Sequence, residues 1–171
     1  MDQLDRLIDT YRARASASMP AKLNVLMDIE RIQDARVVPF LLGILDDSDE
    51  AEDVRIYVLK QLRNGGGLVA TADRPAVAKA IGSLLGGRSP GDLRLQAALA
   101  LGEFIQIEGV LPLLNDVCIA RHESIDLRYA AFTSLERAGP TPECAALLRH
   151  MSGDEALGRA ARSVLSVWHI E

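Results

Sequence analysis

Aromatic residues and cysteines are scarce in this chain. Only 4% of its 171 residues are aromatic although 49% are hydrophobic, so the apolar residues are mostly Ala, Leu, Val and Ile. This mixture favours closely packed helices over β-sandwiches. The two cysteines, Cys118 and Cys144, are too few for a disulfide framework and lack the paired spacing of a zinc site. We therefore expect both thiols to be reduced and buried.

Long apolar runs and an excess of positive charge are also missing. No run approaches the roughly 18 apolar residues that a membrane helix needs. The first six residues lack the basic and then apolar pattern of a secretory signal. We expect a cytoplasmic protein without membrane insertion. The net charge of −5 predicts no nucleic-acid binding, because phosphate contacts need clustered Lys and Arg.

One segment recurs three times along the chain. Residues 53–62, 92–101 and 126–135 each begin with Asp, an apolar residue and Arg, followed by apolar side chains at helical spacing. The three arginines, Arg55, Arg94 and Arg128, are 39 and then 34 residues apart. This period is typical of a repeat made of two helices and their turns. Since a second apolar helix precedes each copy, each repeat is predicted to be a helical hairpin.

Weaker copies of the pattern lie at both ends, where Pro20 and Gly158 stand in place of the motif arginine. Terminal repeats are expected to depart from the pattern because they have a neighbour on one side only. The sequence therefore predicts an all-α, right-handed α-solenoid of about five helical hairpins in one domain, residues 1–171. The predicted helices cover residues 2–15, 19–31, 35–46, 50–63, 73–85, 90–105, 107–120, 124–137, 141–151 and 154–168. The predicted repeats are approximately 2–31, 35–63, 73–105, 107–137 and 141–168.

The repeated pattern resembles the HEAT repeat of the armadillo-like α-solenoid family. The shared features are an apolar residue, Pro and Leu-Leu in the first helix, a turn, and then Asp-apolar-Arg with Ala-Ala and Leu-Gly, best preserved in residues 92–102. The resemblance covers about residues 35–137 and implies the fold, whereas the family includes scaffolds, adaptors and a few enzymes. In that family an aspartate commonly lies six residues before the arginine. Here Asp49, Arg88 and His122 hold that position, so only the first of the three repeats keeps the aspartate.

Three kinds of enzyme built from HEAT-like repeats offer comparisons. Deoxyhypusine hydroxylase uses several His-Glu pairs at such turns, whereas this chain has only His122-Glu123, and one pair cannot build a two-metal site. Alkylpurine glycosylases present a basic cleft with aromatics, which an acidic chain with one Trp does not supply. Bilin lyases have no short motif that can be tested and stay an alternative.

Three other features have structural interpretations. In each Asp-x-Arg pair the acid suits the start of a helix, and the arginine can reach a carbonyl or a neighbouring repeat's carboxylate. The acidic run in residues 46–53 lacks the glycine of a calcium loop and is predicted to be a solvated turn. Residues 64–67, Asn-Gly-Gly-Gly, lack the Lys and Ser/Thr of a phosphate loop and are predicted to connect two repeats. We expect no catalytic residue, no metal ligand and no cofactor.

The second helix of each repeat lines the concave side of HEAT-like stacks and supplies the candidate binding surface. The positions off its buried stripe either pack between repeats or form an apolar centre with a charged rim that fits a protein partner. The resulting expectation is a non-enzymatic scaffold or adaptor that binds a protein partner, with Tyr129 and Leu95 as anchors. The residues of this surface are Ile56, Lys60, Arg63, Leu95, Leu99, Tyr129 and Glu136.

Two alternatives stay open. The first is a lyase-like or chaperone-like subunit that holds a small ligand in the groove, which a pocket with converging, perturbed acids would favour. The second is a homo-oligomer that assembles through the end around residues 168–170.

Overall fold

Helices are the only regular elements in the part of the chain that the computed structural model describes, residues 1–14, 18–63, 67–86 and 88–171. The predicted all-α fold of stacked helical hairpins, the architecture of an α-solenoid, is therefore confirmed. Residues 64–66, part of the predicted connection between two repeats, lie outside the described residues. The α-helices are α1 (Gln3–Ala13), α2 (Met19–Glu30), α3 (Val37–Asp46), α4 (Glu52–Arg63), α5 (Arg74–Leu85), α6 (Gly91–Ala100), α7 (Val110–Ile119), α8 (Ile125–Glu136), α9 (Pro142–Met151) and α10 (Gly158–Val167), with short 3-10 helices η1 (Thr71–Asp73) and η2 (Leu101–Phe104).

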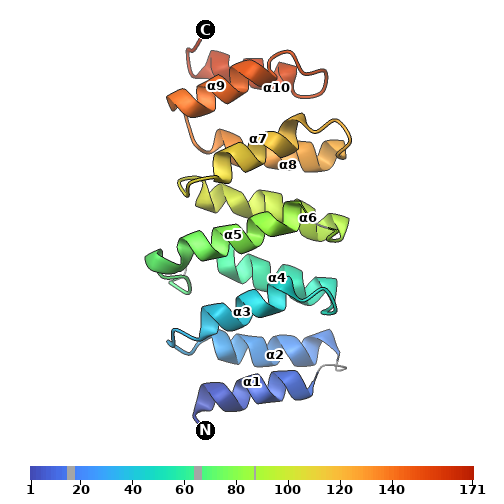
Figure 1. Cartoon of the computed structure of the whole chain (residues 1–171), viewed down its shortest axis with the longest axis vertical. Helices are drawn as coiled ribbons and strands as arrows, with labels where there is room; N and C mark the ends of the chain where they lie inside the picture. The colour runs from blue at the N-terminus through green and yellow to red at the C-terminus, as the bar shows by residue number, and fades with distance from the viewer. Residues whose placement is uncertain (15–17, 64–66, 87) are drawn as a thin grey trace. The chain divides into compact units, whose positions relative to one another are not determined.

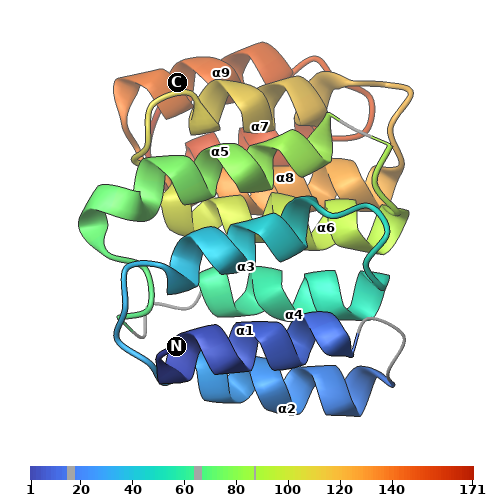
Figure 2. The same ribbon diagram turned by 60° about the horizontal axis from the view of Figure 1, so that its bottom comes forward.

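The hairpins form two compact units, unit 1 (Met1–Asp73) and unit 2 (Arg74–Glu171). In unit 1, α1 pairs with α2 and α3 with α4, and the second helices α2 and α4 pack against each other. Unit 2 contains three hairpins, in which α7 packs between α5 and α9 while α8 packs against α6 (Figures 1 and 2). The first and second helices of the repeats thus form separate layers within unit 2. The single-domain assignment stays a prediction.

Each helix buries the apolar stripe that the sequence pattern places on one face. In α7 the buried residues Val110, Leu114 and Val117 recur at helical spacing, and α3 shows the same pattern. Cys118 and Cys144 are free and buried, as expected. The core of unit 2 includes the fully buried Phe104, whose ring faces the Arg74 guanidinium at 4.5 Å from the ring centroid.

Several helix boundaries differ from the predicted ones for identifiable reasons. The helix predicted over 90–105 ends its α-helical part at Ala100 and continues as η2. Its α-helical part begins as α6 at Gly91, directly after Pro90. The helix predicted over 154–168 begins at Gly158, because the Asp154 carboxylate accepts hydrogen bonds from the N–H groups of Ala156 and Leu157 at 2.8 and 3.0 Å. Such side-chain bonds compete with helix formation.

The repeated arginines end the first helix of their own hairpins. Arg55 donates two hydrogen bonds to the Leu45 carbonyl oxygen, at 2.9 and 2.8 Å from Nε and Nη2. Arg94 does the same at Leu85, and the Arg128 Nε lies 2.7 Å from the Cys118 carbonyl oxygen. The last carbonyls of a helix lack partners within the helix, so these side chains satisfy them. The structural role predicted for the arginines is confirmed.

A ladder of ion pairs also joins neighbouring hairpins within each unit. It links a basic residue in one second helix to an acid in the turn of the next hairpin: Lys22 to Glu50, Arg94 to Glu123 and Arg128 to Asp154, each at 2.7 Å. Glu50 and Glu123 lie five residues before the motif arginines Arg55 and Arg128, not six. The position at which the family's aspartate was expected is therefore one residue too early. Lys22, and not Pro20, takes the arginine's place in the first hairpin. Within the acidic run, Asp46, Asp47 and Asp49 are exposed as expected, whereas Glu50 is held in the ladder.

Candidate functional site

A cavity of about 450 Å³ lies in unit 1, between the end of α2 and the start of α3. The α2 helix tightens at its end, where the Ile32 N–H bonds to the Ile29 carbonyl at 3.0 Å, and a turn over residues 31–36 reverses the chain into α3. The segment 67–73 closes the other side. We call this cavity the Glu30 pocket; its described lining residues are Glu30, Arg31, Ile32, Gln33, Asp34, Ala35, Val37, Val38, Gly67, Leu68, Ala70 and Asp73.

Glu30 is the unusual residue of this pocket. Its Oε1 is buried and has no hydrogen-bond partner, while its Oε2 accepts a hydrogen bond from the Tyr57 hydroxyl of α4 at 3.2 Å. Burial raises the pKa of the Glu30 carboxyl, and the bond from Tyr57 opposes that rise only in part. Burial, together with the Glu30 charge and hydrogen bond, raises the pKa of Tyr57 to about 12. The pocket thus contains a carboxyl whose proton affinity is increased and whose bonding is incomplete.

The position of Glu30 follows from the helix that carries it. It lies four residues after the fully buried Leu26, so the helical repeat turns it toward the interior edge of α2. It is also the last residue of α2, where the negative end of the helix dipole disfavours a carboxylate. Both effects make an ionised Glu30 unfavourable at this position. A residue that conflicts with its local surroundings in this way is typical of functional sites.

Asp34, by contrast, is fully bonded within the same pocket. Arg36 donates to it from its backbone N–H and from Nε and Nη2, at 2.8, 3.0 and 2.8 Å. These bonds lower the pKa of Asp34 to about 2, so it stays ionised at neutral pH. Arg36 also binds Asp2 and Asp5 at 2.6 and 3.0 Å and so ties the turn to α1. Asp34 therefore contributes charge to the pocket while its oxygens are already engaged.

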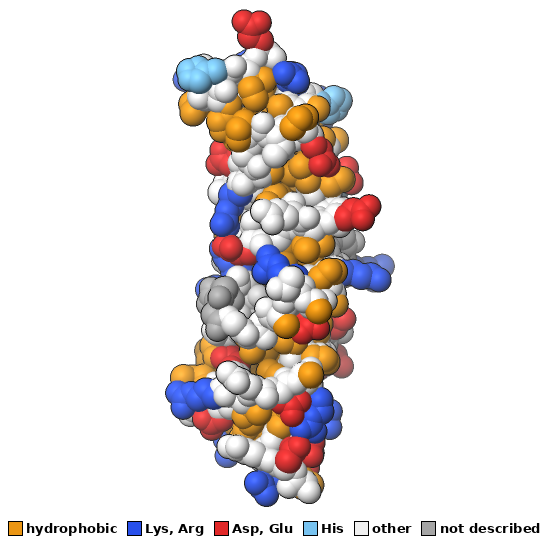
Figure 3. Space-filling model, turned by 90° about the vertical axis from the view of Figure 1, so that its left-hand side faces the viewer, with side chains coloured by type: hydrophobic (Ala, Val, Ile, Leu, Met, Phe, Trp, Pro, Cys, Tyr) orange, Lys and Arg blue, Asp and Glu red, His pale blue; other side chains and the backbone are white. Residues whose placement is uncertain are grey.

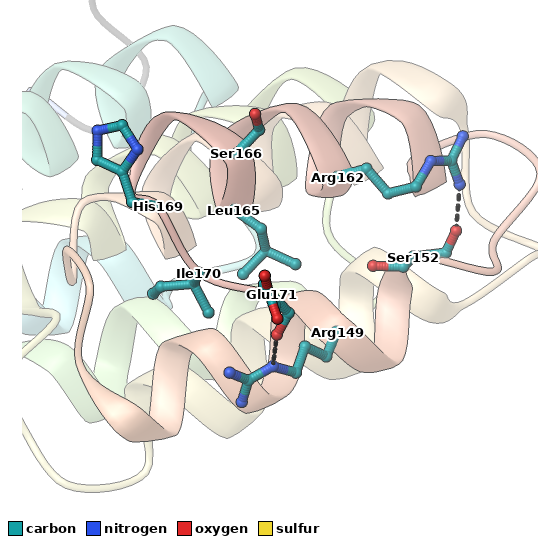
Figure 4. A pocket seen from close by; sticks show the side chains of 8 residues that line it. All are labelled: Arg149, Ser152, Arg162, Leu165, Ser166, His169, Ile170 and Glu171. Atoms are coloured by element: carbon teal, nitrogen blue, oxygen red, sulfur yellow. Dashed lines mark hydrogen bonds between the residues drawn. The ribbon is translucent and has the colours of Figure 1, made fainter.

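Other cavities lie in unit 2, and their polar groups are engaged or exposed. At the α9/α10 hairpin a cavity of about 610 Å³ is lined by Arg149, whose Nε donates to the Glu171 carbonyl at 2.9 Å, and by Arg162, which donates to the Ser152 carbonyl (Figure 4). A groove of about 750 Å³ between α5 and α7 is mostly apolar. Among the described residues, the buried side-chain atoms without a partner are Glu30 Oε1 and Asn115 Oδ1, and Asn115 lines none of these cavities.

The predicted partner-binding residues fall in both units. Leu95 and Leu99 on α6 are half-buried, and Tyr129 on the neighbouring α8 is 43% exposed, with its hydroxyl donating to the Ala156 carbonyl at 3.2 Å. Glu136, also on α8, is half-buried, and burial raises its pKa. The other three residues belong to α4 of unit 1; of these, Lys60 is exposed, while Ile56 and Arg63 are half-buried. Binding of a partner at these residues stays a prediction.

Acidic and basic side chains are interspersed on the face drawn in Figure 3. His122 is exposed, and the carboxylate of Glu123 bonds to Arg94 at 2.7 and 2.8 Å, so this His-Glu pair is part of the ladder turn. Within the described residues no group of three or more His, Cys, Asp or Glu could hold a metal ion. None of the described helices combines the length and the apolar character needed to cross a membrane.

Glu30 and Tyr57 are not among the residues that the sequence predicts to be functional. Tyr57 directly follows Ile56 inside the second-helix motif, but it was not assigned a role. The sequence feature that points to Glu30 is its position at the end of α2, where a carboxylate is disfavoured by the helix dipole. Glu30 also follows Leu26 by four residues, which places both on one helix face. Only the packing of α2 against α4 brings the two side chains together.

The fold and the Glu30 pocket define this chain as a helical-repeat protein with an incompletely bonded acid in a small cavity. No family model matches the chain, and no curated protein matches it either. A search of solved structures finds human deoxyhypusine hydroxylase in complex with glycerol, at 15% sequence identity and a TM-score of 0.46, covering 97% of this chain and 88% of that chain. This match fits the HEAT-like resemblance at the level of an all-helical repeat fold.

The comparison contradicts two of the predictions made from the sequence. The solved structure found is that of an enzyme, which contradicts the expectation of a non-enzymatic scaffold or adaptor and the expectation of no enzymatic activity. The physical reason is that hydrophobic periodicity predicts only the helical-repeat fold. Function depends on particular side chains, and the periodicity does not identify them. At this similarity the chemistry of the hydroxylase does not transfer to this chain. The cytoplasmic location, the protein partner and the lack of nucleic-acid binding stay predictions.

Proposed function

We propose that this protein holds a small organic ligand in the Glu30 pocket. The observation that carries the proposal is the buried Oε1 of Glu30, which has no partner in a wall of the cavity. A buried polar atom without a hydrogen bond costs about 1–3 kcal/mol, and more when the group is charged. A ligand donor that reaches this carboxyl after a small rotation of the Glu30 side chain removes that cost, which supports binding in this pocket.

The size and lining of the pocket support the same function. Its volume of about 450 Å³ lies within the usual range for small-molecule sites, which combine apolar walls with a few polar groups. Here Ile32, Val38 and Leu68 supply apolar surface beside the Glu30 carboxyl. The hydrogen bond from the Tyr57 hydroxyl to Oε2 orients the Glu30 carboxyl at the wall of the pocket.

A thermal-shift screen with a chemically diverse small-molecule library tests the proposal. Compounds that bind should stabilise the wild type, by about 2.7 kcal/mol at a concentration of 100 times Kd. In Ile32→Trp the larger side chain fills the pocket, so the same compounds should lose their effect. The matched control is Ile125→Trp, at an exposed isoleucine outside the pocket, which should retain it. A library without a stabilising compound, or equal stabilisation of Ile32→Trp, would overturn the proposal.

A further inference from the structure

We infer that the ligand of the Glu30 pocket is an organic cation, whose ammonium N–H groups bond to the Glu30 carboxylate while its hydrocarbon part lies against Ile32, Val38 and Leu68. This inference rests on the proposed function and names the class of ligand. Three features of the pocket carry it: the kind of bond that Glu30 lacks, the charge of the lining, and the absence, among the described residues, of a group of three or more side chains that could hold a metal ion.

The first feature is the chemistry of the missing bond. Oε2 already accepts a hydrogen bond from Tyr57, and an ionised carboxylate has only acceptor oxygens, so Oε1 needs a donor. The terminal torsion of a Glu side chain is soft, so a small rotation turns either oxygen toward the cavity. An ammonium group supplies both the donor and the counter-charge. Bonds of this kind are about twice as strong as bonds between neutral groups.

The second feature is the charge of the lining. Among the described lining residues, three are acids, Glu30, Asp34 and Asp73, and one is basic, Arg31. Asp34 stays ionised because Arg36 holds it. Since Arg36 is engaged with carboxylates outside the pocket as well, it does not neutralise the pocket's charge completely. The remaining negative potential of the lining favours binding of a cation and opposes binding of an anion.

The third feature separates an organic cation from a metal ion. Calcium takes six to eight oxygen ligands, and magnesium needs an octahedral set. The oxygens of Asp34 are bonded to Arg36, and the described residues contain no group of three or more side chains that could hold a metal. The apolar walls of the pocket instead fit a hydrocarbon body. One charged head group with an apolar body matches both parts of the lining.

The experiment uses three probes of one carbon frame: cyclohexylmethylammonium, cyclohexylmethanol and cyclohexanecarboxylate. Each is titrated into the full chain while NMR amide shifts are followed. We expect the ammonium to bind at least tenfold more tightly than the alcohol, and the carboxylate to bind more weakly than both. The shifts should concentrate on residues 30–38 and 67–73. Lowering the pH through the raised pKa of Glu30 should weaken binding of the ammonium, with Arg31, Asp34, Tyr57 and Asp73 as the other ionisable groups around the pocket.

Glu30→Gln keeps the shape of the side chain and removes its charge. This variant should lose at least tenfold in affinity for the ammonium and keep its affinity for the alcohol. Asp28→Asn is the matched control, because Asp28 is an exposed acid on the same helix that does not line the pocket, and it should bind like the wild type. Thermal melts should show Glu30→Gln to be folded and at least as stable as the wild type at pH 7, since the ionised carboxyl is unfavourable there.

The outcomes separate the inference from the proposed function. If the alcohol binds as tightly as the ammonium, or if Glu30→Gln retains the preference for the ammonium, the ligand is not a cation recognised by Glu30 and the inference is overturned while the pocket stays a ligand site. If none of the three probes binds, the inference is overturned as well. If the library screen also finds no ligand, the proposed function fails with it.

Discussion

The buried cluster that joins the two hairpins of unit 1 gives the sharpest test of how this fold is held together. Lys22 of α2 bonds to Glu50 in the turn before α4 at 2.7 Å, and the Tyr11 hydroxyl of α1 donates to the same carboxylate. The Ala51 N–H donates to Glu50 Oε1 at 2.8 Å. The Lys22 and Glu50 side chains are each only 7% exposed. The changes that test this cluster are Lys22→Met, Glu50→Gln and both together.

The expected magnitude follows from burial. Removing one partner of a buried ion pair leaves the other charge without compensation in a low-dielectric site, which costs about 3–5 kcal/mol. Each single change should therefore lower the free energy of unfolding by about that amount. The double variant leaves no charge stranded, so it should cost no more than either single change. The exposed pair of Arg137 and Glu103, with side chains 46% and 37% exposed, is the control; Arg137→Gln should cost about 0–1 kcal/mol.

Urea unfolding followed by far-UV circular dichroism measures these differences, while fluorescence of Trp168, the single Trp of the chain, reports on unit 2. Two single variants that each cost less than 1 kcal/mol and add up in the double variant would refute the reasoning.

The dependence of stability on acid pH gives a second readout of the same cluster. Burial raises the pKa of Glu50, but the hydrogen bonds from Lys22, Tyr11 and Ala51 outweigh it, so the pKa lies below its ordinary value of 4.5. Stability from Glu50 is present above pH 4.5 and is lost as the pH falls through the lowered pKa, and Glu50→Gln should remove this part of the acid sensitivity.

Two further predictions concern unit 2. Asp154→Ala strands Arg128, since the two side chains are 11% and 8% exposed, and it should lower the free energy of unfolding followed by Trp168 fluorescence by about 3–5 kcal/mol; a loss below 1 kcal/mol would contradict the role of the ladder. Burial raises the pKa of the Cys118 thiol to about 12 and that of Cys144 to about 11, so neither should react with a disulfide reagent at pH 8 until urea unfolds the chain. Rapid modification of the folded protein would show that these thiols are accessible.

Much of the fold could be predicted because it depends on neighbours along the chain. The Asp-apolar-Arg segments predict both ends of α4 and α8, and the start of α6, to within two residues. They do so because the apolar period and the acid of the first turn act locally. The same segments predicted that arginine reaches a carbonyl or a neighbouring carboxylate, which Arg94 and Arg128 do. The helix start predicted at Asp154 is wrong, because the Asp154 side chain accepts a hydrogen bond from a backbone N–H group that would otherwise lie in the first turn of the helix.

The pocket could not be predicted in the same way. Glu30 and Tyr57 are 27 residues apart, and each fits a helical pattern on its own. The ladder acids were misjudged by one residue, because a sequence comparison with a family position does not fix which turn side chain faces the arginine. A repeat pattern also describes how helices stack and not which side chains are left without partners.

The sequence by itself determined the helices, their pairing into hairpins and the arginines that end the first helix of the central repeats, because these depend on short-range periodicity and on bonds within one hairpin. Only the tertiary structure decided which acid meets Lys22, Arg94 and Arg128, and that Glu30 lies buried in a cavity beside Tyr57. These contacts depend on the register between hairpins. That register is set by the packing of whole helix faces, and a shift of one residue changes every partner across it.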